Sequence, residues 1–181
     1  MKTFLRYALL FSLLAVGPVV LSSGGEHVGA VASVSQDSVS TSPRMIADMI
    51  IKKGESLLGT PYHYGSGGPK SFDCSGFASY VYKQFGFDLD HSSTGISRQG
   101  RKVEGGWSNL QKGDLVIFTA RHNSGRIGHV GIFIECDSTG KDFTFIHAAV
   151  QGGVRISHIS EPYYSSRYVG ARRVLPDFTD E

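Results

Sequence analysis

Cys74 stands in a setting that favours nucleophilic chemistry. It follows a glycine-rich segment, residues 65–68, and opens a run in which Phe77, Val81 and Phe85 recur at helical spacing. A helix that begins near Cys74 would present unpaired backbone N–H groups and the positive end of its dipole to the sulfur. Because a thiol with a pKa of roughly 8.5 needs such help to ionise near neutrality, this position predicts a reactive thiolate.

Two histidines could serve this thiol. His129 opens an apolar segment that is typical of a strand, and His147 ends the next such segment. If residues 136–142 form a hairpin turn, the antiparallel register returns His147 to the neighbourhood of His129. The competing interpretations are a strand-capping or partly exposed His129 and a His147 satisfied within the core. Together with Cys74, the two histidines predict a cysteine–histidine catalytic arrangement.

The only other cysteine, Cys136, is a candidate for a disulfide with Cys74, the usual arrangement of a cysteine pair in an exported protein. It lies seven residues after His129 on the same expected strand, or roughly 23 Å at about 3.3 Å per residue. Disulfide-linked Cα atoms must lie within about 7 Å of each other. If His129 approaches Cys74, Cys136 therefore cannot bridge to it, and we expect Cys136 to pack as a small apolar residue.

Other chemistries lack support in the sequence. No His-x-x-x-His or Cys-x-x-Cys spacing occurs, so we expect no metal and no cofactor. No Gly-x-Ser-x-Gly motif indicates a serine nucleophile. A formal net charge of +2 without a dense basic cluster argues against nucleic-acid binding.

The elements that would position these residues follow from periodicity and capping signals. Ser42 and Pro43 predict the start of a helix that runs to about residue 58, where Gly59 ends it. A second helix is expected from Cys74 to about Gly86, before a loop-rich stretch. Strands are expected at 114–118, 129–134, 143–147 and 169–174. This order predicts an α+β domain with an antiparallel sheet against N-terminal helices.

The N-terminus predicts an export signal over residues 1–32. Lys2 and Arg6 precede an apolar run, residues 7–21, that is shorter than the roughly 20 residues of a spanning helix. A retained anchor is the alternative, and cleavage could fall after Ala32 or nearer the apolar run. Residues 33–42 would then be a flexible lead-in to a catalytic domain at 43–181. We expect export to the periplasm, the cell envelope or the medium, with no stable membrane insertion after cleavage.

Four segments, taken in order, resemble the NlpC-type cell-wall peptidases. They are residues 73–77, 112–118, 128–133 and 145–148. The resemblance extends from about residue 45 to 175 and implies a papain-like fold.

The resemblance also implies roles for individual residues. Cys74 matches the nucleophile, His129 matches the base, and His147 matches the third polar residue, which orients the base. The positions that it places beside the nucleophile or the substrate are Tyr62, Asp73 and Ser75.

The implied substrate is the peptidoglycan stem peptide, hydrolysed between D-γ-glutamate and a diamino acid such as meso-diaminopimelate during wall remodelling or turnover. Two alternatives stay open. One is a papain-like amidase or acyltransferase acting on another wall amide, and the other is a peptidoglycan-binding module without activity. The sequence gives no oligomeric state.

Overall fold

The computed structural model describes residues 42–178. The expected signal peptide, 1–32, and all but the last residue of the expected lead-in, 33–42, lie outside this part. Within residues 42–178, no helix has the length and apolar character needed to cross a membrane.

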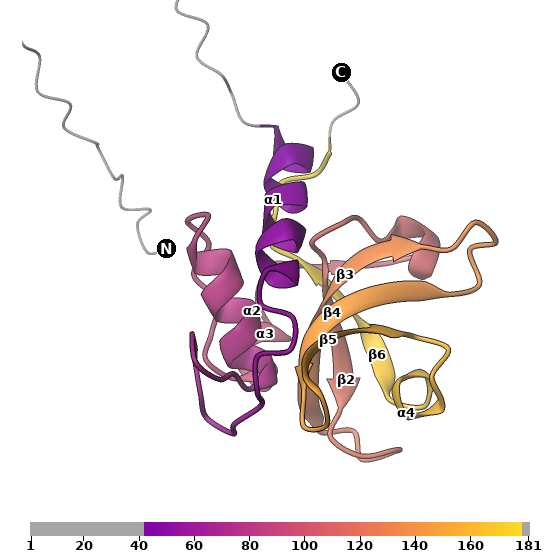
Figure 1. The fold of residues 1–181 in the computed structure, drawn as a ribbon. Coiled ribbons are helices and arrows are strands. Elements are labelled where there is room, and N and C mark those ends of the chain that lie inside the picture. Colours follow the sequence, from indigo (N-terminus) through magenta and orange to yellow (C-terminus); the bar gives the residue numbers. More distant parts are fainter. Residues whose placement is uncertain (1–41, 179–181) are drawn as a thin grey trace, which may run out of the picture. The chain divides into compact units, whose positions relative to one another are not determined.

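A six-stranded antiparallel sheet forms the centre of the fold, as Figure 1 shows. The strand order is β1-β6-β2-β3-β4-β5. The bounds are β1 Arg101–Val103, β2 Leu115–Thr119, β3 Ile127–Cys136, β4 Phe143–Ala149, β5 Gly153–His158 and β6 Tyr168–Arg173. The α+β architecture predicted from the sequence is confirmed.

Two longer helices, α1 (Pro43–Glu55) and α2 (Cys74–Lys83), precede the sheet in the chain. Ser42 caps α1, since its side chain accepts a hydrogen bond from the Met45 N–H at 3.3 Å. The helix ends at Glu55, three residues before the predicted end, and turns lead on to Gly59. The short elements are α3 Ser93–Ile96, the 3₁₀ helix η1 Trp107–Asn109 and α4 Pro162–Ser165.

The sheet carries a hydrophobic cluster on each face because successive side chains of a strand point to opposite sides. Ile146 of β4 packs with α1 and α2, whereas the neighbouring Phe145 packs in an aromatic cluster with Phe118 and Tyr164. The first cluster fixes the helices against the sheet. The second covers the opposite face, on which His129 and His147 lie.

Four of the six strands are predicted from the sequence, and two are missed. β1 lies in the stretch expected to be loop, and β5 follows β4 after a short turn. The β5 residue Val154 is buried and Ile156 is 36% exposed. β5 contributes to the candidate site described below, because Ser157 contacts His147 and Arg155 lines the pocket.

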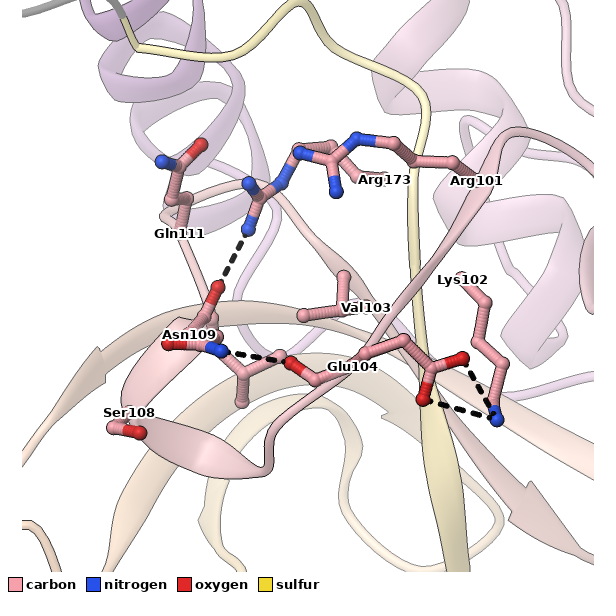
Figure 2. Close-up of a pocket in the computed structure, with 9 residues that line it drawn as sticks. Arg101, Lys102, Val103, Glu104, Ser108, Asn109, Gln111 and Arg173 are labelled. Atoms are coloured by element: carbon pink, nitrogen blue, oxygen red, sulfur yellow. Dashed lines mark hydrogen bonds and ion pairs between the residues drawn. The ribbon is translucent and has the colours of Figure 1, made fainter.

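A buried ion pair joins the start of β2 to the end of β6. Arg173 donates from Nε and Nη2 to the carboxylate of Asp114, both at 2.7 Å. It also donates from Nη2 to the Asn109 carbonyl at 2.8 Å, as Figure 2 shows, and from Nη1 to Asp177 at 2.9 Å. Arg173 thereby links β6 to the start of β2, to the end of the 3₁₀ helix and to the C-terminal segment at Asp177. It also lines a pocket of about 470 Å³. None of the site residues predicted from the sequence lines that pocket.

Candidate active site

The first turn of α2 positions Cys74. Asp73 is the N-cap, and its carboxylate accepts hydrogen bonds from the backbone N–H groups of Gly76 at 2.6 Å and Gly65 at 2.9 Å. Ser75 donates from its hydroxyl to Asp73 at 3.0 Å. The predicted start of the second helix at Cys74 is confirmed. Asp73 joins that helix start to the preceding glycine-rich loop, and Ser75, which also donates to the His91 carbonyl at 3.2 Å, joins it to the segment before α3.

Gly76 permits a close approach between this loop and the helix. A Cβ at this position would lie 2.2 Å from the Ser66 carbonyl oxygen. That same carbonyl accepts a hydrogen bond from the Asp73 N–H at 2.8 Å. The glycine therefore lets the loop support the turn that carries Cys74.

The β3–β4 hairpin brings the two histidines together. Cys136 pairs with Phe143 and Ile132 with Ile146, so the turn falls where the sequence predicted it. His129 Nε2 lies 2.8 Å from His147 Nδ1. The two residues are diagonal neighbours, and a Cβ added to the intervening Gly131 would lie 3.4 Å from the Cβ of His147.

Two hydroxyl groups hold His147 from its other side. His147 Nε2 lies 3.2 Å from the Ser157 hydroxyl and 3.3 Å from the Tyr164 hydroxyl. His147 and Ser157 are completely buried. Burial, followed by the charges of His129 and Arg155, lowers the pKa of His147 well below its usual value, so its ring is neutral. The sequence analysis missed Ser157 and Tyr164.

Cys74 and His129 line one pocket of about 570 Å³. Its other lining residues are Tyr62, Thr119, Ala120, Gly128, Ala148, Ala149, Val150, Gln151, Arg155, Glu161, Tyr163 and Tyr164. Of the residues carried over by resemblance, Tyr62 therefore faces the pocket. Asp73, Ser75 and His147 do not line it. The sulfur lies against β3, 4.0 Å from the Gly128 carbonyl oxygen.

Comparison with known proteins identifies the family. Residues 59–173, which include Cys74, His129 and His147, match the NlpC/P60 family. The chain belongs to the NlpC/P60 family. The resemblance inferred from the four sequence segments is thus confirmed.

Several named relatives share this domain. A γ-D-glutamyl-L-lysine dipeptidyl-peptidase of Bacillus cereus is 36% identical over 135 residues, covering 74% of this chain and 38% of its own length. A murein DD-endopeptidase/LD-carboxypeptidase, MepS, of Escherichia coli is 42% identical over 118 residues, covering 65% of this chain and 57% of its own. The chain thus spans between about two fifths and three fifths of the length of these relatives.

A solved NlpC/P60 family structure from Bacillus cereus superposes with a TM-score of 0.64 at 36% identity. The match covers 72% of this chain and 40% of that one. The fold and the expectation of a cysteine peptidase acting on peptidoglycan agree with these relatives.

The protonation states of this NlpC/P60 site differ from those expected from the helix dipole alone. Burial, followed by the negative charge of Asp73, raises the pKa of the Cys74 thiol and outweighs the backbone N–H groups that lower it. Burial and the charge of Arg167 lower the pKa of His129 to about 4. At neutral pH the Cys74 thiol and the His129 imidazole are therefore both neutral.

The second cysteine lies apart from this site. Both cysteines are free, and the Cys136 thiol donates to the Trp107 carbonyl at 3.7 Å, near the far end of β3. The prediction that Cys74 and Cys136 form no disulfide is confirmed. Within the described residues 42–178, no group of three or more His, Cys, Asp and Glu side chains could hold a metal ion.

Proposed function

We propose that this protein is a cysteine peptidase that hydrolyses peptidoglycan stem peptides in cell-wall remodelling or turnover. The observation that carries the proposal is a pocket lined by Cys74 and His129, with His129 hydrogen-bonded to His147 at 2.8 Å. A thiol, a base and a residue that orients the base are the parts that nucleophilic acyl transfer requires. The names of the relatives supply the substrate class.

The proposed scissile bond joins D-γ-glutamate to a diamino acid such as meso-diaminopimelate. Two relatives support this assignment by name, the γ-D-glutamyl-L-lysine dipeptidyl-peptidase and a γ-DL-glutamyl hydrolase of Bacillus subtilis that is 32% identical. The Escherichia coli relative is named for other murein bonds. Hydrolysis of another wall amide is therefore the second candidate function.

In the proposed mechanism, His129 removes the Cys74 proton as the sulfur attacks the scissile carbonyl carbon. Because Nε2 of His129 is bonded to His147, Nδ1 is the nitrogen left to exchange this proton. His147 stabilises the resulting imidazolium by accepting from Nε2 at its own Nδ1. The hydrogen of neutral His147 then lies on Nε2, where the Ser157 and Tyr164 oxygens accept it. The imidazolium protonates the departing amine, and water hydrolyses the thioester.

The oxyanion would be bound by the backbone N–H of Cys74 and the hydroxyl of Tyr62. Burial and the neighbouring Cys74 raise the pKa of Tyr62 to about 12, which keeps its hydroxyl protonated and able to donate. Loss of one such donor typically costs on the order of 100-fold in rate. We further propose that Asp73 and Ser75, which flank the nucleophile but do not line the pocket, support substrate binding by holding the turn that carries Cys74.

The proposal places the protein outside the cytoplasm, with residues 1–32 as its signal peptide. This location follows from the substrate, because peptidoglycan is assembled outside the membrane, and from the apolar N-terminal run. N-terminal sequencing of the protein recovered from the envelope or the medium tests it. Recovery of an intact N-terminus from the cytoplasm would contradict it.

The activity is tested by incubating the protein with purified peptidoglycan fragments and measuring the masses of the products by mass spectrometry. We expect products split after D-γ-glutamate with the wild-type protein and with Cys136→Ser, and none with Cys74→Ala. Binding without cleavage by the wild type would instead indicate a peptidoglycan-binding module. Cleavage by Cys74→Ala would disprove the assigned nucleophile.

A further inference from the structure

Two opposite charges line the pocket that contains Cys74. Arg155 on β5 and Glu161 at the start of α4 are the only Arg, Lys, Asp or Glu side chains that line this pocket. Arg155 Nη2 lies 3.5 Å from both carboxylate oxygens of Glu161. The two side chains are 42% and 36% exposed. An ion pair with such long, solvent-exposed contacts is weak. Arg155 and Glu161 can therefore each bind a charged group of a ligand in place of the other.

The position of this pair is fixed beside the catalytic histidines. Arg155 is the cross-strand partner of His147, and its charge helps to lower the pKa of that histidine. Glu161 accepts a hydrogen bond from the His158 N–H at 2.9 Å, which holds its carboxylate in place. A ligand group bound by the pair therefore lies close to the residues that act on the scissile bond.

We infer that Arg155 and Glu161 form a subsite for a substrate residue whose side chain ends in a carbon that bears both an ammonium and a carboxylate. The guanidinium takes the carboxylate, in the bidentate geometry that suits it, and the carboxylate of Glu161 takes the ammonium. The inference rests on the proposed function and refines it. Among the diamino acids that follow D-γ-glutamate, meso-diaminopimelate has this zwitterionic end, whereas lysine has only the ammonium.

The experiment compares three tripeptides with the full chain: L-Ala-γ-D-Glu-meso-diaminopimelate, the same peptide with the distal carboxylate amidated, and L-Ala-γ-D-Glu-L-Lys. The readout is the ratio of kcat/KM between substrates, because Arg155 lies beside His147 and its replacement also affects general activity. The variants are Arg155→Gln and Glu161→Gln. The matched control is Lys102→Gln, which breaks an exposed ion pair to Glu104 at 3.0 Å on β1, outside this pocket.

We expect wild type and Lys102→Gln to prefer the diaminopimelate peptide over both others by about 10- to 100-fold, as the loss of a charged hydrogen bond predicts. Arg155→Gln should abolish that preference, and Glu161→Gln should weaken all three reactions. An equal loss of kcat/KM on all three peptides in Arg155→Gln would leave the ratios between substrates unchanged and would overturn the inference. Failure of the wild type to cleave any peptide would refute the proposed bond instead.

Discussion

Alkylation of Cys74 by iodoacetamide is expected to accelerate about tenfold with each pH unit between 6 and 8. The reactive species is the thiolate, and burial together with Asp73 raises the thiol pKa above its ordinary value of roughly 8.5. At pH 7 the thiolate fraction is then below about 3%. Raising the pH towards the pKa increases that fraction in proportion, so the rate rises without a plateau in this range.

The assay follows the mass of the modified protein over time at fixed pH values from 5 to 10. A Cys136→Ser background confines the reaction to one thiol, since both cysteines are free. Asp73→Asn removes the second cause of the raised pKa while leaving an amide that can still cap α2. This variant should react faster than its parent at pH 7. His129→Ala should follow the same pH dependence as its parent.

A rate that stays constant between pH 5 and 8 would refute this reasoning. It would show that the sulfur is already a thiolate paired with an imidazolium before substrate binds. In that case His129→Ala would restore the steep dependence on pH. The two results thus separate proton transfer during attack from a preformed ion pair.

Two further variants test the residues that support the site. Arg173→Met leaves the carboxylate of Asp114, which is 1% exposed, without its guanidinium partner. The free energy of unfolding, measured with urea, should therefore fall by about 3–5 kcal/mol. The control Arg101→Met breaks the exposed ion pair to Asp177 and should lower the free energy of unfolding by less than about 1 kcal/mol. Similar losses of stability in the two variants would contradict the role of burial. Ser157→Ala combined with Tyr164→Phe should lower kcat by about 10- to 100-fold with little change in KM. It should also shift the ¹⁵N resonances of the His147 ring away from the Nε2–H tautomer, and an unchanged tautomer would refute the proposed hydrogen bonds.

Most of the fold, and the convergence of Cys74, His129 and His147 at one place, could be predicted because their signals are local. Cys74 follows a capping residue and opens a helix with an apolar stripe, and the two histidines bound a hairpin of apolar strands. The end of α1 was placed too late because Leu57 extends the apolar spacing into the turns after the helix. Met49 also fits the apolar spacing of this helix, yet it is exposed, whereas Ala47 and Ile51 are buried.

What the sequence could not supply depends on tertiary contacts. β1 has three residues, two of them exposed and basic, and it exists only because β6 pairs with it. β5 alternates apolar and polar residues over 154–157, a strand signal that went unused. Its Ser157 reaches His147 only after β4 and β5 pair. The raised thiol pKa depends likewise on burial, which no local motif reveals.

The hairpin turn between β3 and β4 offers a place to attach a label. Residues 137–142 close it, with the Asp137 carboxylate accepting from the Lys141 and Asp142 N–H groups, and the exposed Gly140 has φ +66°. His129 lies toward the opposite end of β3, roughly 23 Å away at about 3.3 Å per residue. A fluorescent tag inserted at this tip would therefore leave the reacting groups undisturbed. Microscopy of the labelled protein would then test whether it reaches the cell envelope, as proposed.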